Sequence, residues 1–159
     1  MSDLLRAAAG IPNACEPLPG LLTGGQPTAE HIAALARAGC EVVLDIRDPM
    51  EPRGLDEADL VRAAGMEYLN LPVTGAHLTD ATLARVRDTV ANLVGDRKAL
   101  FHCGSGNRVG ATLIPYLVLD RGMAAEDAVA QAIRIGTRRA ELIEWALDYV
   151  NRQQGAGTP

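Results

Sequence analysis

Cys103 stands where an apolar run meets a short loop of small residues, which is a setting suited to nucleophilic chemistry. Residues 98–102 are mostly apolar, and Gly104, Ser105, Gly106 and Asn107 separate the cysteine from Arg108. Small residues let successive backbone N–H groups point toward one centre, and a helix that begins there adds the positive end of its dipole. Such a nest binds an oxyanion and favours a thiolate over a thiol. The pattern therefore predicts that Cys103 is a nucleophile.

Arg108 closes the loop with a side chain that suits the same anion. A planar guanidinium can hold two oxygens of a tetrahedral anion at once. The loop residues and the position after the arginine are therefore candidate substrate-binding positions: Gly104, Ser105, Gly106, Asn107 and Val109. The alternative is that Cys103 is a buried core cysteine, because free cysteines are often buried. That alternative explains neither the glycines nor the arginine.

A second polar group follows another apolar run. Asp45, Arg47 and Asp48 come directly after residues 42–44, at the carboxyl end of a predicted strand. Ligands of open α/β sheets bind at that end. Arg47 is therefore a further candidate for substrate binding, and solvated loop charges are the alternative.

The elements that must position these residues alternate between helix and strand. The predicted strands cover residues 41–46, 66–71 and 98–103, and helical patterns cover 28–38, 55–64, 80–94, 107–121, 124–135 and 138–152. Gly39, Gly65 and Gly95 stand where three of the helices must end. The order predicts an α/β fold with a central, mostly parallel sheet flanked by helices and a helical C-terminal portion.

Length and composition limit the classes of function. A chain of 159 residues forms one domain, with a core at about 18–151 and a flexible tail at 153–159. The net charge of -5 and the scarcity of aromatic residues argue against nucleic acid as a partner. No apolar run approaches the ~20 residues of a membrane span. The N-terminus lacks a secretory leader, so we expect a cytoplasmic protein.

The three cysteines, Cys15, Cys40 and Cys103, do not follow the spacing of a zinc site or a disulfide framework. The sequence therefore predicts neither a metal nor another cofactor. It makes no prediction of oligomeric state.

The segment from His102 to Arg108 resembles the signature of the protein tyrosine phosphatase superfamily, which is His-Cys, a short loop containing Gly, and Arg. Gly25-Gln26-Pro27 and the Leu-Pro-Val at 71–73 resemble more closely the bacterial phosphatase-like family also found fused to β-lactamase-like hydrolases, the DUF442 type. The likeness covers roughly residues 18–140. It implies a tyrosine-phosphatase-like fold, Cys103 as nucleophile, Arg108 as anion clamp and Gln26 as a residue that lines the cleft. The alternative for Gln26 is that it only caps a turn before Pro27.

Three departures from that pattern bear on the chemistry. Only four residues separate Cys103 from Arg108, where most tyrosine phosphatases have five and sulfurtransferases of the rhodanese type have the shorter loop. Val109 stands where phosphatases usually place Ser or Thr. The loop expected to carry the general-acid aspartate reads Val-Thr-Gly at 73–75 and has no carboxylate.

Two nearby residues could supply the missing proton. Asp80 is the nearest acid, although an aspartate there is also suited to capping a helix. His77 lies on the same loop and is of a type suited to acid catalysis near neutral pH, with a solvated loop histidine as the alternative.

Three hypotheses of function follow, and all take an anionic substrate. The first is a cysteine-dependent phosphatase that acts on a phosphorylated substrate. The second is a rhodanese-like sulfurtransferase or persulfide carrier, which tolerates a short loop and a missing acid. The third is a non-catalytic anion-binding module.

Overall fold

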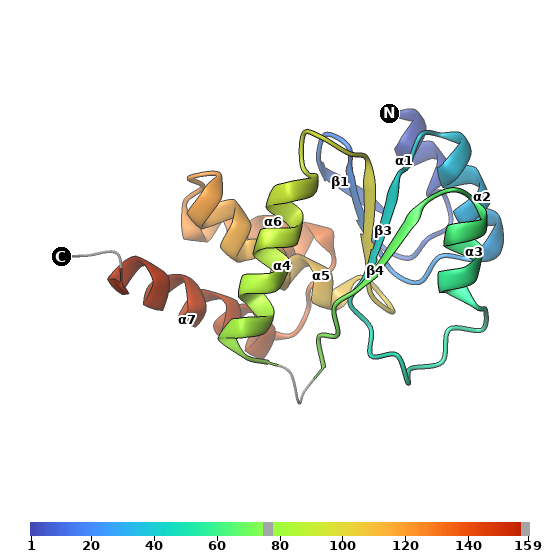
Figure 1. Ribbon diagram of the computed structural model, residues 1–159. Helices are drawn as coiled ribbons and strands as arrows, with labels where there is room; N and C mark the ends of the chain where they lie inside the picture. Colours follow the sequence, from blue (N-terminus) through green and yellow to red (C-terminus); the bar gives the residue numbers. More distant parts are fainter. Residues whose placement is uncertain (75–77, 157–159) are drawn as a thin grey trace.

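The computed structural model describes residues 1–74 and 78–156 and contains a five-stranded sheet with helices on both faces (Figure 1). The strand order is β1-β2-β5-β3-β4. β1 and β2 pair antiparallel, and the other neighbours pair in parallel. The strands are β1 (Cys15–Leu18), β2 (Leu21–Gly24), β3 (Val42–Asp45), β4 (Glu67–Asn70) and β5 (Ala99–His102). The predicted α/β fold with a mostly parallel sheet is confirmed.

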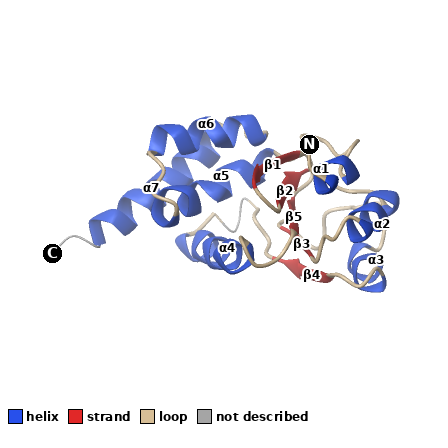
Figure 2. Ribbon diagram, turned by 90° about the horizontal axis from the view of Figure 1, so that it is seen from above, coloured by secondary structure: helices blue, strands red, loops and turns tan. Residues whose placement is uncertain are grey.

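The helices divide between the two faces of the sheet. Figure 2 shows α1, α2 and α3 on one side and the group from α4 to α7 on the other. A π-helix, η2 (Tyr116–Asp120), follows α5 directly. The bounds are α1 (Asp3–Ala7), α2 (Ala29–Arg37), α3 (Glu57–Ala63), α4 (Asp80–Leu93), α5 (Asn107–Pro115), α6 (Ala125–Ile135) and α7 (Ala140–Ala156).

Each face of the sheet has its own apolar core, because successive side chains of a strand point to opposite faces. In β3 and β5, Leu44 and Phe101 belong to the core beneath α4–α7, whereas Val43 and Leu100 belong to the core beneath α1–α3. All four side chains are fully buried. Burial on both faces explains why these strands read as continuous apolar runs.

The three predicted strands are present, each one residue shorter at both ends than its apolar run. The sequence analysis missed α1, β1 and β2. β1 and β2 have four residues each and are joined by a tight turn at Gly20, which has a positive φ of 82°. Strands this short give little periodicity to read, and the parallel pairing of β2 with β5 joins segments that are far apart in the chain.

Two predictions about the helical portion were wrong in detail. The segment 107–121 is not one α-helix, since η2 begins directly after Pro115, which lacks the N–H group of other residues. The last helix does not end at residue 152, because α7 continues to Ala156. The flexibility expected of the tail at 153–159 stays a prediction. Buried side chains such as Tyr149 and Val150 attach the second half of α7 to the core, and the helix continues for a further turn.

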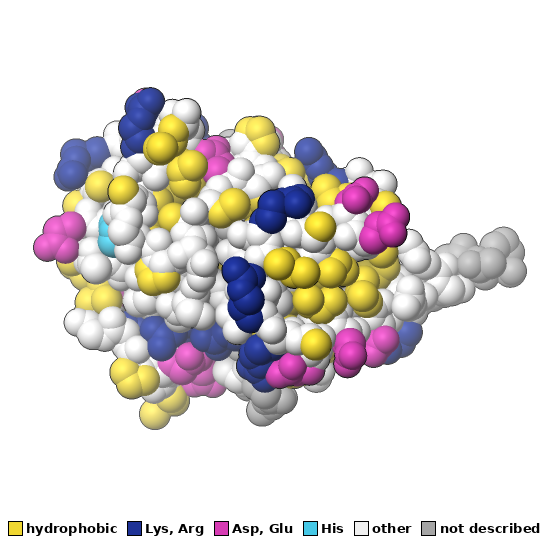
Figure 3. Space-filling view, turned by 180° about the vertical axis from the view of Figure 1, so that it is seen from behind, with side chains coloured by type: hydrophobic (Ala, Val, Ile, Leu, Met, Phe, Trp, Pro, Cys, Tyr) yellow, Lys and Arg dark blue, Asp and Glu magenta, His cyan; other side chains and the backbone are white. Residues whose placement is uncertain are grey.

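The surface carries charges of both signs. On the face in Figure 3, Lys and Arg side chains lie among Asp and Glu side chains, and hydrophobic side chains gather toward the C-terminal end of the chain. Within residues 1–74 and 78–156, no helix has the length and apolar character needed to cross a membrane. The expectations about nucleic acid and cytoplasmic location stay predictions.

Gly110 provides a test of the packing of α5 against α6. A Cβ atom at this position would lie 2.5 Å from the Ala132 carbonyl oxygen and 2.6 Å from Thr137 Oγ1. We expect Gly110→Ala to lower the free energy of unfolding by about 1–3 kcal/mol, because the backbone of α6 must move. Urea denaturation measures the change. Gly155→Ala is the control, since no atom lies within 4 Å of its Cβ position; equal effects of the two substitutions would contradict the packing argument.

Candidate active site

The loop after β5 arranges its backbone around the sulfur of Cys103. Cys103 is fully buried at the end of the strand, and the Gly106 N–H donates a hydrogen bond to its Sγ at 3.1 Å. Gly106 has a φ of 94°, a left-handed conformation that favours glycine, and it is the N-cap residue directly before α5. The sulfur therefore lies close to the positive end of the α5 dipole.

Neighbouring segments hold this loop in place through its backbone. The Cys103 N–H donates to the Gly24 carbonyl at 3.1 Å, and the Gln26 N–H donates to the Gly104 carbonyl at 2.9 Å. Asn13 Nδ2 donates to the Ser105 carbonyl at 2.7 Å. A Cβ atom on Gly25 would lie 2.6 Å from the Gly104 oxygen, so only glycine fits there. The glycine of the Gly-Gln-Pro motif thus permits the close approach of two loops.

Arg108 is fixed by two acceptors outside the loop. Its Nη1 and Nη2 donate to the two carboxylate oxygens of Glu51 at 3.0 Å each, and Nη1 also donates to the Val73 carbonyl at 3.0 Å. Burial alone opposes the charged form, but the contacts with Glu51 and Cys103 raise the pKa of Arg108 above its ordinary value. These contacts leave the Nε–Nη2 edge of the guanidinium toward the loop, where it can bind an oxyanion.

Arg47 approaches the same loop from the carboxyl end of β3. A Cβ atom on Gly104 would lie 3.6 Å from Arg108 Nη2 and 3.7 Å from Arg47 Nε. Both guanidinium groups therefore converge on Gly104, and Glu51 is the carboxylate that contacts both. The two guanidinium groups bring positive charge to the loop beside Cys103. Positive charge favours a bound anion at this point.

Glu51 is ionised in this arrangement. The hydrogen bonds from Arg108 lower its pKa from 4.5 to about 2, and the Asp48 N–H adds a bond of 2.7 Å in the same direction. While Glu51 holds Arg108, it therefore has no proton to donate near neutral pH. Its contacts assign it the role of a positioning residue.

A cleft of about 540 Å³ opens over Arg108. Its wall is mainly apolar, and Arg139 stands in the lining as a second cation. Ligand sites commonly combine an apolar wall with a few polar groups that fix orientation. The described residues that line it are Asp48, Met50, Glu51, Pro52, Val73, Thr74, Leu78, Arg108, Arg139 and Leu142.

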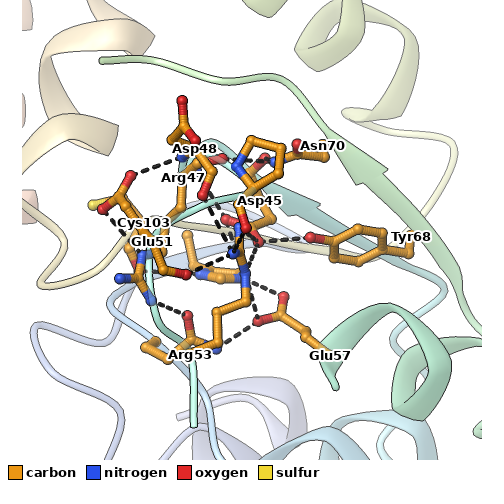
Figure 4. A network of polar contacts seen from close by, with 12 residues as sticks. Asp45, Arg47, Asp48, Glu51, Arg53, Glu57, Tyr68, Asn70 and Cys103 are labelled. Carbon is orange, nitrogen blue, oxygen red and sulfur yellow. Dashed lines mark hydrogen bonds and ion pairs between the residues drawn. The ribbon is translucent and has the colours of Figure 1, made fainter. Parts of the chain in front are cut away.

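A buried polar network lies behind the loop (Figure 4). Asp45 accepts from Tyr68 Oη at 2.7 Å and from Arg53 Nε at 2.9 Å. Burial, followed by the hydrogen bond to Asp45, raises the pKa of Tyr68. Glu57 of α3 reaches His102, the last residue of β5. This network connects β3, α3 and β5 directly behind the loop that carries Cys103.

Among the described residues, one group of side chains could hold a metal ion. The ligand atoms of Asp45, Glu57 and His102 lie within 4.8 Å of one another. Arg53 already forms an ion pair with Asp45 at 2.8 Å, so a cation would have to displace the guanidinium. The donor set therefore fits a metal poorly, and the absence of a metal stays a prediction.

The structure brings several predicted residues together and separates others. Cys103, Gly104, Gly106, Arg108 and Arg47 meet at the loop. Ser105 is exposed at the loop and contributes its carbonyl to Asn13.

Three other predicted residues make contacts of a structural kind. Asn107 Oδ1 accepts from the Arg138 N–H at 2.7 Å. Val109 is fully buried in the core, so its side chain does not line the cleft. Gln26 forms hydrogen bonds with Arg47 and Glu57, and it therefore connects the arginine at the loop with the buried polar network.

Of the two candidate acids, Asp80 is among the described residues and His77 is not. Asp80 is the first residue of α4, with Thr79 as the helix cap, and both its oxygens accept from Arg152. This contact lowers the pKa of Asp80 and keeps it ionised, which is unfavourable for a proton donor. His77 lies outside the described residues.

The sequence analysis missed Glu51 and Glu57. Glu51 comes four residues after Arg47 on the loop that leaves β3, which is a place where ligands of α/β sheets bind. That position was the signal that could have identified it. Glu57 carried no such signal, because its contact with His102 spans 45 residues.

Comparison with known proteins finds solved structures with a similar fold. A DUF442 protein from Shewanella putrefaciens CN-32, provisionally named a phosphatase, superposes with a TM-score of 0.78 at 20% identity, covering 93% of this chain and 97% of the other. TpbA of P. aeruginosa, in a complex with pTyr, superposes with a TM-score of 0.64 at 20% identity, covering 90% and 88%. The chain has the tyrosine-phosphatase-like fold. The resemblance seen in the sequence is confirmed at the level of fold.

One curated relative is a β-lactamase hydrolase-like protein of Xylella fastidiosa, 26% identical over 129 residues. The match covers 79% of this chain and 30% of the relative, so the chain spans about a third of that protein's length. No family model matches the sequence. The likeness therefore concerns only part of that protein.

Alkylation tests whether the loop activates Cys103. We expect iodoacetamide to modify Cys103 faster than Cys15 at about pH 6.5, although Cys15 is more exposed, because thiolates react and thiols do not. Cys40 is the internal control, since burial raises its pKa to about 11. Peptide mass spectrometry after timed quenching gives the three rates. Equal rates at Cys103 and Cys15 would exclude an activated thiolate.

The contact between Glu51 and Arg108 predicts a dependence of stability on pH. Because folding lowers the pKa of Glu51 from 4.5 to about 2, its contribution is present above 4.5 and is lost as the pH falls toward 2. Glu51→Gln should therefore be less stable than wild type near neutral pH, with a difference that shrinks across this window. Urea denaturation at several pH values measures it. Glu144→Gln, on the exposed side of α7, is the control that should show no such window.

Proposed function

We propose that this protein is a cysteine-dependent phosphatase that acts on a phosphorylated, anionic substrate. The thiolate of Cys103 attacks phosphorus, the ester oxygen leaves with the organic group, and a phosphocysteine forms. Water then attacks phosphorus, releases inorganic phosphate and restores the thiolate. The loop N–H groups and the Nε–Nη2 edge of Arg108 stabilise the three non-bridging oxygens throughout.

The proposal rests on the position of Cys103 and Arg108 at the same loop. The Gly106 N–H bonds the sulfur at 3.1 Å, and Arg108 is held by Glu51 with its remaining edge toward the same loop. The nucleophile thus lies at the same centre as the anion-binding backbone N–H groups and the guanidinium of Arg108. The tyrosine-phosphatase-like fold supports this interpretation, since proteins with a similar fold include a kinase associated phosphatase and a PP-IP phosphatase. The proposal concerns this chain and does not extend to the whole of the longer curated relatives.

The leaving group must depart with little help from the described residues. Glu51 is ionised while it holds Arg108, and Asp80 is paired with Arg152. An unprotonated leaving group departs according to its own stability. The proposed enzyme should therefore favour esters whose alcohol or phenol is a good leaving group.

A sulfurtransferase is the second candidate, and the short loop favours it. Four residues between Cys103 and Arg108 make a smaller cradle than the five of most tyrosine phosphatases. In this reaction Cys103 takes the outer sulfur of thiosulfate, sulfite leaves, and the persulfide passes its sulfur to cyanide or a thiol. Neither the departure of sulfite nor the transfer of sulfur to the acceptor needs a general acid. A non-catalytic module that only binds an anion is the third candidate.

A parallel assay separates the three candidates. We expect one preparation to hydrolyse p-nitrophenyl phosphate and to transfer no sulfur from thiosulfate to cyanide. Cys103→Ser should abolish phosphate release while keeping the fold, because its hydroxyl is far harder to ionise. Thiocyanate formation without phosphate release would favour the sulfurtransferase. Sulfate or phosphate binding with neither activity would leave the anion-binding module.

The leaving-group dependence tests the account of the missing acid. We expect rates with a series of aryl phosphates to fall steeply as the phenol becomes less acidic, and alkyl phosphates to react slowest. Asp80→Ala should leave the slope unchanged, since Asp80 is held ionised by Arg152. If His77 supplies the proton, His77→Ala should cost on the order of 10²-fold with poor leaving groups and much less with good ones. A flat series that neither substitution changes would identify another acid.

A further inference from the structure

His102 and Glu57 form a buried pair directly behind the loop that carries Cys103. The side chain of His102 is fully buried and that of Glu57 is 1% exposed. His102 Nδ1 lies 3.1 Å from the carbonyl oxygen of Cys103, and Nε2 lies 2.6 Å from Glu57 Oε2. Both ring nitrogens are therefore at hydrogen-bond distance from an oxygen.

The chemistry of these two oxygens determines how many protons the pair holds. A backbone carbonyl only accepts, so Nδ1 must carry a hydrogen. An ionised carboxylate also only accepts, and an unprotonated Nε2 facing it would place two lone pairs 2.6 Å apart in a dry site. The contact requires a hydrogen between the two atoms. The pair therefore holds one proton more than a neutral imidazole and a carboxylate.

The surrounding charges favour placing that proton on His102. Asp45 lies 4.0 Å from Nε2, so two carboxylates flank the ring. Arg53 lies 2.8 Å from Asp45 and 4.0 Å from Glu57 and supplies one positive charge. The hydroxyl of Tyr68 donates to Asp45 and stays neutral. With His102 as an imidazolium, the buried group contains two anions and two cations, which avoids an uncompensated buried charge.

Glu57 also connects this pair to the anion-binding side of the loop. Its Oε1 accepts from Gln26 Nε2, and Gln26 Oε1 accepts from Arg47 Nη1 at 2.8 Å. Arg47 in turn contacts Glu51, which holds Arg108. Both oxygens of Glu57 are thus used, one toward His102 and one toward Gln26. Figure 4 shows Glu57 beside Arg53 in the same network.

We propose that Glu57 is a positioning residue that keeps His102 doubly protonated, so that an imidazolium supports the Cys103 carbonyl and favours the adjacent thiolate. The shared proton follows from the geometry alone. Its effect on Cys103 rests on the proposed nucleophilic role of that residue. Both parts can be measured without turnover, so their failure is distinguishable from the failure of the proposed phosphatase activity.

The first experiment observes the protons on His102 directly. In protein labelled with ¹⁵N-histidine, we expect both ring nitrogens of His102 to be protonated near neutral pH, with His102→Asn identifying the signals. In Glu57→Gln, the amide NH₂ can donate to a bare Nε2 while Nδ1–H stays on the Cys103 carbonyl. The variant keeps both hydrogen bonds and removes the proton, so one nitrogen should become unprotonated. A bare ring nitrogen in the wild type would overturn the proposal.

The second experiment measures the effect on the thiol. At about pH 6.5, alkylation of Cys103 in Glu57→Gln should slow about tenfold, which is the equivalent of one pH unit, and should match wild type at high pH. Glu57→Asp keeps a carboxylate and should restore much of the rate. Glu144→Gln is the matched control and should change nothing. A folded Glu57→Gln protein with the wild-type pH profile would show that Glu57 only contributes to stability, and would overturn its proposed role.

Discussion

The central position of β5 is the constraint on which the site depends. β5 is hydrogen-bonded to β2 on one side and β3 on the other, so the ends of three parallel strands meet at one edge of the sheet. The loop after β2 supplies Gln26, the loop after β3 supplies Arg47 and Glu51, and the loop after β5 supplies Cys103 and Arg108. Residues separated by more than 50 positions therefore share one centre.

Electrostatic pairing then divides this centre into two halves. Behind the loop, Asp45, Glu57, Arg53 and the imidazolium that we propose at His102 balance one another in a dry environment. In front of it, Glu51 pairs with both Arg47 and Arg108. These guanidinium groups lie beside Gly104, where a thiolate or an oxyanion can also pair with them.

Ion pairing also bears on how protons move in this site. Two carboxylates near the site, Glu51 and Asp80, each hold an arginine and are ionised by that contact. Catalysis in the proposed reaction therefore comes from the charge of the cradle and from a preformed nucleophile. Such a site is as suited to sulfur transfer as to phosphate esters of good leaving groups, because neither needs a strong acid.

The sequence by itself determined the local features: the three apolar strands, most of the helices, and the loop from Cys103 to Arg108, whose glycines and arginine have one physical explanation. Local patterns suffice there because turn geometry and strand periodicity act over a few residues. Only the tertiary structure decided which side chains meet this loop. Glu51 is 57 residues from Arg108 and Glu57 is 45 residues from His102. No local propensity encodes such distances, and parallel pairing of the strands brings these residues together.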